Sequence, residues 1–593
     1  MGVKRYYYDW FDRGVLLRSY LKRILFWILL ISLGLVIYQI SFPKESLIHD
    51  RVNIFLRQIP RLLIPIYLYK WSLPFFTPKG HPQKLIRDNS DIVFALGLTA
   101  FHFLKHSYWV LEGEWFLYII LSLLASFKLM REGELVKGTM LNPSLLLVGS
   151  FIFLILIGTA ILLIPGATRG NLPFIDALFM ATSAVCITGL GSVDPGVAFT
   201  PLGHISLVVL IQLGGLGLMT FTNFFSYLFK GGMSFHNHMV MSNLIETNTP
   251  SSLANTLLKI FVYTGIVELV GAVAIWWFTD WPGEYDFLTS VFHSISAFCN
   301  AGFSTLEGGL YHPEVRFAYA LHLILIFLIV LGGIGFPVVI DVYDSIKRIL
   351  ITNIWRDWNL KGGFISPARY LTVHSRLVLT TTGILLILGM VVFYIAERNN
   401  TLRVHDTWVG VLVASLFGAV TPRTAGFATF DVGGLMQGTV LAYLLLMWIG
   451  ASPSSTGGGI KTTTFAIAFS NVIALARGKD RVELFRREIT HESIRRAFAV
   501  IFLSLIIIGL AIFLISLFEP HQSLTRIAFE CFSAYSTVGL SMNLTPELSV
   551  PSKYVLIATM IIGRIGLFTF LVGVLQKSSV HDYRYPKENV LIL

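Results

Sequence analysis

The chain has 593 residues, of which 54% are hydrophobic and only 13% are charged. A composition this apolar excludes an ordinary soluble protein, and many runs approach the roughly 20 residues that cross a bilayer. The three cysteines exclude a disulfide framework and have no zinc-site spacing. The net charge of +11 indicates basic cytoplasmic loops rather than a nucleic-acid surface.

Residues 1–140 are predicted to form a transmembrane extension that lies outside the repeats described next. This region contains apolar runs at 24–42, 62–76, 92–104 and 115–127. The basic start of the chain and the region 128–137 both have the character of cytoplasmic segments, so an even number of spans fits best. We expect about four helices here.

The remainder of the chain repeats one pattern four times. Each copy has a long apolar helix, a short apolar segment, a turn containing glycine and a second long apolar helix. The short segments cannot span the bilayer, so we interpret them as re-entrant pore helices. The turn sequences are SAVCITGLG (183–191), SAFCNAGFS (296–304), AVTPRTAGF (419–427) and AYSTVGLS (534–541). The expected repeats are residues 141–250, 251–372, 373–494 and 495–593.

Each repeat therefore predicts three helices at defined positions. The first long helices are expected at 145–165, 257–278, 377–395 and 497–518. The short helices are expected at 174–185, 287–298, 407–420 and 524–535. The second long helices are expected at 202–229, 317–342, 439–469 and 555–575. The fold class is thus an all-α membrane protein with four membrane–pore–membrane repeats around a central pore, plus the N-terminal extension.

The four turns are the predicted selectivity filter. Glycine tolerates the positive φ that lets successive carbonyls point to one side, where they can replace an ion's hydration shell. The last turn also contains Thr-Val-Gly, the opening of the potassium-channel filter sequence TVGYG. The predicted potassium-binding residues are Ile187, Thr188, Gly189, Asn300, Ala301, Gly302, Thr424, Ala425, Gly426, Thr537, Val538 and Gly539.

The second long helix of the third repeat is interrupted by GASPSSTGGGIK at 450–461. Proline removes a hydrogen-bond donor and the glycines lower helix propensity, so this run predicts a break at mid-membrane, beneath the filter. It is not a phosphate-binding loop, because isoleucine precedes the lysine where that motif needs glycine. A kinked helix without function is the alternative. The predicted gating residues are Gly450, Ser452, Pro453, Ser454, Ser455, Thr456, Gly457, Gly458, Gly459 and Lys461.

Arg564, in the final helix, is a further predicted gating residue. A charge at membrane depth is costly and is usually paired or faces a pore; snorkelling of the side chain to the interface is the alternative. Its guanidinium can reach free carbonyls near residues 452–456.

Other polar residues receive structural interpretations. Asp176, His293 and Glu530 are expected to anchor the filter by hydrogen bonds, and the cysteines to pack behind it. Glu268 needs a partner that the sequence does not identify.

Basic residues concentrate in the linkers 347–376 and 477–496, which places these linkers in the cytoplasm and the filter turns outside. Acidic residues near the outer ends of the helices can then attract cations. These residues are Asp194, Glu284, Asp286, Glu307, Glu519 and Glu547.

Taken together, the four turns, the interrupted helix, LIQLGGLGLMTF (210–221), GRIG (563–566) and the tail RYPKENVLIL resemble the Trk/Ktr/HKT superfamily of potassium transporters, most closely the bacterial KtrB-type pore subunit. The resemblance implies a carbonyl filter, a gating loop matching 450–461 and a gating arginine matching Arg564. It also implies a homodimer on a cytosolic ring of nucleotide-binding regulatory subunits. The N-terminal extension departs from the family pattern, as does Leu567, where the family commonly has proline.

The predicted function is potassium uptake across the bacterial cytoplasmic (inner) membrane by a multi-pass protein, through a gated pore driven by membrane potential. No cofactor is expected besides the transported potassium, membrane lipid is the expected surround, and no enzymatic nucleophile and base are recognisable. A sodium-conducting or sodium-coupled transporter is one alternative, although Gly189 stands where sodium-selective plant relatives have serine. A pore-like subunit of an ATP-driven potassium pump is another, with ATP use supplied by a partner.

Overall fold

The computed structural model describes residues 143–230, 253–279, 281, 286–356 and 371–566, together with Ile28, Leu35, Gln58 and Ile59. The chain separates into two compact units: residues 1–140 with 164–166 and 225–233, and residues 141–163, 167–224 and 234–593. The predicted spans of the N-terminal extension lie almost wholly outside the described residues.

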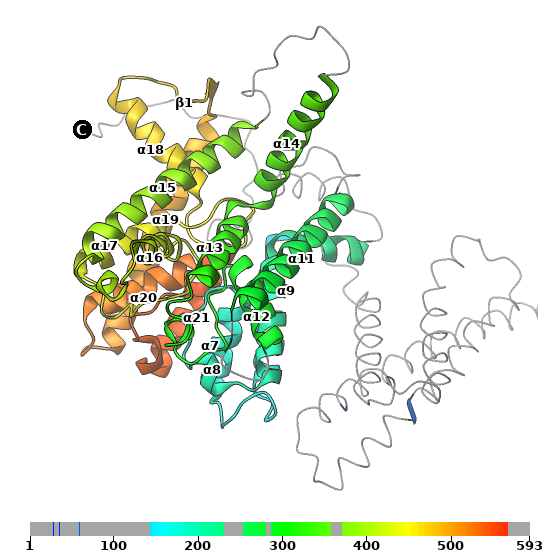
Figure 1. Ribbon diagram of the computed structural model, residues 1–593, viewed down its shortest axis with the longest axis vertical. Helices are drawn as coiled ribbons and strands as arrows, with labels where there is room; N and C mark the ends of the chain where they lie inside the picture. Colours follow the sequence, from blue (N-terminus) through cyan, green and yellow to red (C-terminus); the bar gives the residue numbers. More distant parts are fainter. Residues whose placement is uncertain are drawn as a thin grey trace, which may run out of the picture. The chain divides into compact units, whose positions relative to one another are not determined.

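The described residues of the second unit are almost entirely α-helical and fall into four successive groups, coloured cyan to red in Figure 1. Each group begins with one long helix: α6 (Pro143–Leu162), α11 (Leu253–Phe278), α15 (Val373–Glu397) and α19 (His491–Phe518). A short helix follows: α7 (Phe174–Val185), α12 (Asp286–Phe298), α16 (Trp408–Val420) and α20 (Leu524–Ser536). After the turn come α9 (Pro201–Lys230), α13 (Tyr319–Ile334) with α14 (Phe336–Arg356), α17 (Gln437–Trp448) with α18 (Thr462–Ala476), and α21 (Val550–Ile565).

Short elements complete the described chain. These are α8 (Pro195–Ala198), the 3-10 helices η5 (Gly309–Tyr311), η7 (Thr401–Val404) and η8 (Thr545–Glu547), and the strands β1 (Glu483–Leu484) and β2 (Arg487–Glu488). The strands form an antiparallel hairpin that pairs Glu483 with Glu488 and Leu484 with Arg487. This hairpin, in the basic linker before α19, is the only β-sheet among the residues described.

Side-chain caps fix where several helices begin. Thr407 Oγ1 accepts a hydrogen bond from Gly410 N before α16, and Ser523 Oγ accepts one from Arg526 N before α20. A cap of this kind satisfies a donor that would otherwise lack a partner in the first turn. The four short helices lie within one residue of their predicted bounds, and α7 matches its prediction at both ends.

Two predictions for the helices after the turns are wrong. The helix expected at 317–342 breaks at Gly335 (φ +95°), where α13 and α14 meet at an angle of 101°. The helix expected at 555–575 ends at Ile565, because Gly566 adopts φ +83°. Positive φ cannot continue a right-handed helix, and glycine adopts it at little cost. By contrast, the predicted break in the third group is confirmed, since α17 ends at Trp448 and α18 begins at Thr462.

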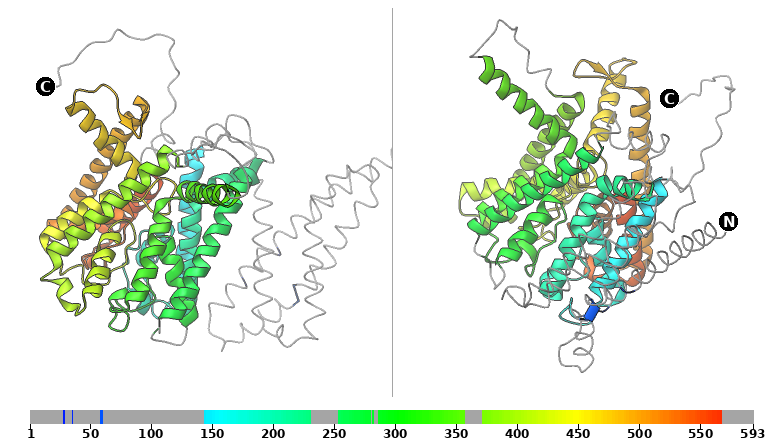
Figure 2. Two further views of the ribbon diagram at one scale, coloured as in Figure 1. Left: turned by 45° about the horizontal axis from the view of Figure 1, so that its top comes forward. Right: turned by 90° about the vertical axis from the view of Figure 1, so that its right-hand side faces the viewer.

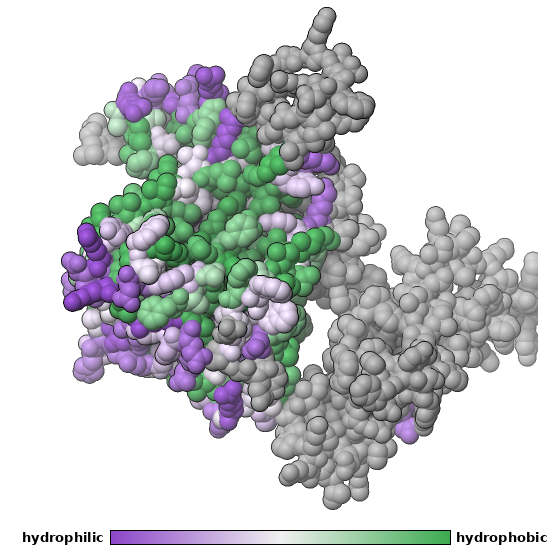
Figure 3. Space-filling model, viewed as in Figure 1, coloured by the Kyte–Doolittle hydropathy of each residue, from purple (hydrophilic) through white to green (hydrophobic). Residues whose placement is uncertain are grey.

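Three described helices are long and apolar enough to cross a bilayer: Lys259–Phe278 of α11, α15 and α19. The bent pair α13 and α14 would make a fourth span. Their outer faces carry large apolar side chains, among them Trp277 (75% exposed), Ile387 (68%) and Leu517 (61%). Figure 3 shows a hydrophobic band across the described part, with hydrophilic residues at its two ends. An apolar surface of this extent suits contact with lipid.

The four groups pack in a cyclic order. Helix α13 packs against α16, α17 against α20, and α21 against α7, so the helix after each turn contacts the next group's short helix. Between the first two groups, His204 of α9 meets Phe292 of α12 with ring centroids 5.9 Å apart. The last group therefore returns to the first, and Figure 2 shows the four groups, coloured cyan to red, side by side in two views.

Candidate functional site

The four glycine turns share one backbone conformation. In each turn the glycine and the residue two before it have positive φ, whereas the residue between them does not. The positive angles belong to Ile187 (54°) and Gly189 (87°), Asn300 (59°) and Gly302 (71°), Thr424 (68°) and Gly426 (76°), and Thr537 (50°) and Gly539 (94°). Such alternation allows successive carbonyl groups to face one side of the strand, as a carbonyl-lined ion path requires.

The four glycines form a closed ring. A Cβ added to Gly302 would lie 2.7 Å from the carbonyl oxygen of Ala425 in the next turn. The same relation, always under 3.0 Å, joins Gly189 to Ala301, Gly426 to Val538, and Gly539 back to Thr188. Each predicted filter turn thus touches its neighbours in the order first, second, third, fourth, first. Glycine is required at these positions for two reasons. The backbone has positive φ, and the neighbouring carbonyl oxygen leaves no room for a Cβ atom.

Hydrogen bonds from the end of each short helix hold these turns. Ala301 N donates to Ser296 O over 2.7 Å, and the hydroxyl of Ser296 donates to Phe303 O beyond the glycine over 2.9 Å. Corresponding amide bonds join Thr188 to Ser183 (2.8 Å), Ala425 to Thr421 (3.1 Å) and Val538 to Ser533 (2.9 Å). Because the turn amides are engaged at the back, their carbonyls remain available to a ligand on the ring axis.

His293 and Glu530 hold the segments after two of the turns, as predicted. Each lies nine residues before its glycine. His293 Nε2 lies 2.9 Å from Ser304 Oγ. Glu530 accepts hydrogen bonds from Ser541 Oγ (2.5 Å), Met542 N (3.1 Å) and Thr545 Oγ1 (2.7 Å). The equivalent positions in the first and third groups are Met180 and Phe417. Polar clamps therefore hold the second and fourth turns, which are opposite one another in the ring.

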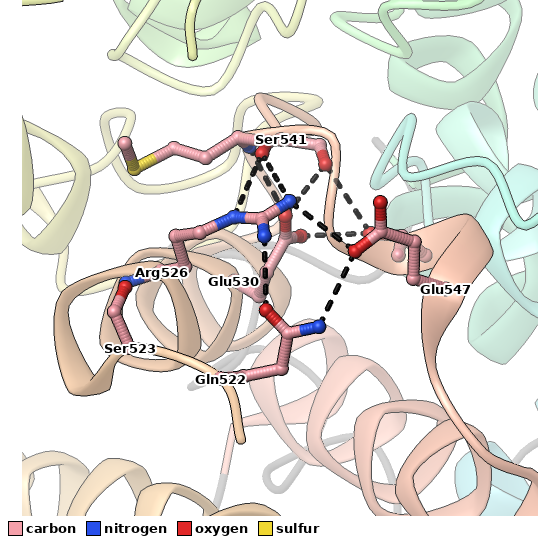
Figure 4. Close-up of polar contacts among 8 residues, drawn as sticks. Gln522, Ser523, Arg526, Glu530, Ser541 and Glu547 are labelled. Carbon is pink, nitrogen blue, oxygen red and sulfur yellow. Dashed lines mark hydrogen bonds and ion pairs between the residues drawn. The ribbon is translucent and has the colours of Figure 1, made fainter. Parts of the chain in front are cut away.

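The fourth turn has an additional anchor that sequence reasoning missed. Arg526 donates from Nε and Nη2 to Met542 O (3.3 and 3.1 Å) and from Nη1 to Gln522 Oε1 (2.9 Å). Its Nη2 also lies 3.5 Å from a carboxylate oxygen of Glu547 (Figure 4). The available signal was spacing, since Arg526 and Glu530 lie four residues apart on one helix face and Gln522 lies four residues before Arg526.

Asp176 does not contact its own turn. Its Oδ1 accepts a hydrogen bond from Lys553 Nζ of α21 over 2.7 Å, and both side chains are about nine-tenths buried. The prediction that Asp176 anchors the filter turn by a hydrogen bond is therefore wrong, because its carboxylate is bonded to Lys553 of another helical group. The ion pair instead joins the fourth group to the first.

Several of the predicted outer acids have structural partners. Asp194 accepts hydrogen bonds from Gly196 N and Gly308 N, the second of which lies in the next group. Glu519 is bonded by Ser549 and Ser552; although partial burial opposes it, these bonds lower the pKa of Glu519, so this carboxylate stays ionised at neutral pH. Glu284 lies outside the described residues.

The predicted gating segment is a loop closed at its base. Ile449 and Ile460 form a parallel bridge, Gly450 N donates to Ile460 O (2.9 Å), and Ala451 N donates to Gly458 O (3.3 Å). Inside the loop, Lys461 Nζ donates to Gly457 O over 2.7 Å. The loop therefore folds back on itself between α17 and α18 rather than forming a simple kink.

The tip of the loop touches three of the four turns or their short helices. Thr456 Oγ1 donates to Phe298 O, at the end of α12, over 3.2 Å. A Cβ added to Gly457 would collide with Thr424 Oγ1, and one added to Gly458 with Thr537 Oγ1. The glycines thus bring the loop backbone directly beneath the ring.

The same loop meets the unpredicted break in the second group. Ser452 N donates to Gly333 O (3.1 Å), and Phe336 N, the first amide of α14, donates to Ser454 O (3.2 Å). A Cβ on Gly335 would lie 2.5 Å from Pro453 O, which explains why the break occurs at a glycine. The two interrupted helices are therefore bonded to each other.

Arg564 joins this loop to the first group. The side chain is 3% exposed; Nη1 donates to Thr456 O, and Nη2 donates to Gly214 O of α9 over 2.9 Å. The predicted hydrogen bond to the 452–456 carbonyls is therefore present, and interfacial snorkelling does not describe this side chain. Arg564 thus adds the first and fourth groups to the loop's contacts with the second and third, so the loop is connected to all four groups.

Behind the ring, Cys186, Cys299 and Cys531 are buried free thiols, as predicted. Glu268 of α11 has the partner that the sequence could not identify, since Gln212 Nε2 of α9 donates to its Oε2 over 3.1 Å. Among the described residues no group of three or more His, Cys, Asp or Glu side chains has metal-binding geometry.

Comparison with known proteins gives a consistent result. A sequence model of the family described as "TrkH: Cation transport protein" matches residues 114–581, beginning before the expected first repeat at residue 141. The "Ktr system potassium uptake protein B" of Bacillus subtilis is 36% identical over 469 residues, covering 78% of this chain and 99% of that protein. The "Potassium/sodium uptake protein NtpJ" of Enterococcus hirae is 34% identical, covering 76% and 97%. The crystal structure of the potassium transporter TrkH from Vibrio parahaemolyticus shares the fold, with a TM-score of 0.59, 14% identity, and coverage of 87% of this chain and 97% of that one.

Proposed function

This chain belongs to the TrkH family of cation transport proteins, and we propose that it takes up potassium across the bacterial cytoplasmic membrane through a gated, potassium-selective pore. The family is one of transporters, not enzymes. The proposal treats the four helical groups as membrane–pore–membrane repeats. Residues 1–140 are proposed to add about four further spans.

The ring of glycine turns carries this proposal. Four turns, each with alternating backbone angles and each touching the next, surround one axis. Carbonyl oxygens on such an axis can replace the hydration shell of a potassium ion without any charged ligand. The proposed filter is the set of three residues ending at each glycine: 187–189, 300–302, 424–426 and 537–539.

The loop 450–461 and Arg564 are proposed to form the gate. The loop lies against the filter turns, and a cation that is permanently charged is bonded to it. In this arrangement the loop obstructs the path and the guanidinium repels potassium. Opening requires the hydrogen bonds from Arg564 to Thr456 O and Gly214 O to break. Local rearrangements of this kind gate many sites.

Membrane potential supplies the driving force for inward movement. One positive charge gains about 2.3 kcal/mol per 100 mV. Uptake therefore needs no covalent chemistry in this chain, and no cofactor is proposed beyond the transported ion.

Partners follow from the relatives whose names describe a Ktr system. We propose a homodimer in membrane lipid that sits on a cytosolic ring of nucleotide-binding regulatory subunits. The basic linker before α19 and the helix α14, which is bonded to the gate loop, are proposed to face these subunits.

Sodium-coupled or sodium-conducting transport is a second candidate, because one relative is named a potassium/sodium uptake protein. Expression in a bacterium that lacks its own potassium uptake systems distinguishes the two. Growth on limiting potassium that is independent of sodium supports the first proposal. Growth that requires sodium supports the second, and no growth in either medium contradicts both.

A further inference from the structure

Arg423 is a buried cation that the transport mechanism does not use. It directly precedes Thr424 in the third turn and is 8% exposed. Its Nε is buried without a hydrogen-bond partner, and its guanidinium makes no ion pair with any described residue. An isolated charge at membrane depth is costly, so such side chains normally have a partner.

A small cavity lies beside this guanidinium. Its volume is about 20 Å³, and its lining includes Arg423 and Thr382 together with the apolar side chains Ile329, Val330, Leu386 and Val420. The hydroxyl of Thr382 is also buried without a partner. Two polar groups of the third helical group, one on α15 and one in the third turn, therefore line the same partly open cavity.

The size and chemistry of the cavity restrict its occupant. The space beside the guanidinium holds about one water-sized particle. Both polar groups at the site can donate, and one carries a full positive charge. A water molecule would satisfy donors without neutralising the charge, whereas a monatomic anion does both.

We propose that this cavity binds one chloride ion, held by the Arg423 guanidinium and the Thr382 hydroxyl. The anion neutralises a cation whose backbone is continuous with the third filter turn. Without it, the uncompensated charge of Arg423 acts on potassium in the filter through a medium of low dielectric constant, where like charges repel strongly. Chloride is thereby a structural ion of the third turn and a condition for fast potassium movement.

Binding is tested on the purified full-length chain by thermal unfolding at constant potassium, with chloride replaced stepwise by gluconate, which is too large for the cavity. We expect a saturable upward shift of Tm with chloride and with bromide, because a ligand that binds only the folded state stabilises it. Arg423→Gln should abolish the shift and Thr382→Val should weaken it. Arg398→Gln, an exposed arginine at the end of the same helix as Thr382, is the matched control and should retain it.

An anion-independent Tm in the parent, or a full chloride shift in Arg423→Gln, would overturn the site and leave water as its occupant. If Arg423→Gln does not fold, Thr382→Val and the position of bromide in an anomalous-scattering map decide the question. Bromide between Arg423 and Thr382 supports the proposal, and bromide absent from the cavity at saturating concentration contradicts it.

The consequence for transport rests on the proposed function and is tested separately, in proteoliposomes with a fixed potassium gradient. Replacement of chloride by gluconate should lower the initial uptake rate severalfold in the parent, and Arg423→Gln should be insensitive to the anion. Chloride binding with anion-independent uptake would overturn the link to the pore. Absence of potassium uptake in every anion would instead contradict the proposed function.

Discussion

Lys553 Nζ lies 2.7 Å from Asp176 Oδ1, and this buried ion pair joins the first turn of α21 to the first turn of α7 across 377 positions of sequence. Helix α21 belongs to the fourth group and α7 to the first, so the pair closes the ring between the last group and the first. Asp176 lies near the start of the helix that precedes the first filter turn, and Lys553 lies near the start of the helix that follows the fourth. The pair thus fixes the junction at which the two ends of the repeated sequence meet.

Removal of either partner leaves an uncompensated buried charge. We expect Lys553→Met or Asp176→Asn alone to destabilise the protein by about 3–5 kcal/mol, measured as a fall in the unfolding midpoint. The double variant Asp176→Asn, Lys553→Met should lose less than the sum, because no unpaired charge remains. Additive losses in this cycle would show that the two residues are not coupled.

Gly189→Ser should weaken selection of potassium over sodium. The serine Cβ would collide with the carbonyl oxygen of Ala301, and the residue must hold φ +87°. The ratio of potassium to sodium uptake measures the effect. Gly509→Ser, at a helical glycine with open space around it, is the control and should leave the ratio unchanged. A parental ratio in Gly189→Ser would remove this turn from the filter.

Deletion of residues 454–458 should raise potassium flux and loosen control by regulatory subunits. The deletion removes the loop tip that lies against Thr424 and Thr537, together with the acceptor of Arg564. Initial uptake rates in vesicles provide the measurement. The same deletion combined with Arg564→Ala should add little, since both disrupt one closed state. A folded deletion variant with lower or unaltered flux would contradict gating by this loop.

Arg564→Ala should raise maximal uptake with little change in selectivity. The substitution removes a permanent charge and the bonds to Thr456 O and Gly214 O, whereas the filter carbonyls are untouched. Arg564→Lys should be intermediate, because it keeps the charge and loses the planar donor geometry. The prediction fails if the alanine variant keeps the parental maximal rate or loses selectivity instead.

Ser541→Ala should lower the preference for potassium over sodium by up to about tenfold, since a hydrogen bond contributes about 0.5–1.5 kcal/mol. The serine hydroxyl donates to Glu530 and holds the segment after the fourth turn. Ser304→Ala should act alike through His293 in the opposite turn. Ser516→Ala, whose hydroxyl bonds only within α19, is the control. Unchanged selectivity in both turn variants would mean that the clamps do not position the filter.

The sequence alone determined the features that depend on neighbouring residues. Each short helix is an apolar segment followed by a glycine turn, and these local signals placed α7, α12, α16 and α20 to within about a residue. The interruption at 450–461 was equally clear, because proline and glycine act on the backbone where they stand. The need for positive φ at the four glycines was likewise predictable.

Only the tertiary structure decided the relationships between groups. The break at Gly335 was missed although Gly332, Gly333 and Pro337 stand beside it, because the long apolar run was interpreted as one continuous span. In the structure, Pro453 and Ser454 of the distant loop contact this break. Asp176 is hydrogen-bonded to Lys553, Glu268 to Gln212, and Arg564 to Gly214, and each partner belongs to another helical group. These contacts join positions up to hundreds of residues apart, so no local pattern encodes them. They exist because closing four groups around one axis brings the ends of the chain's repeated sequence together.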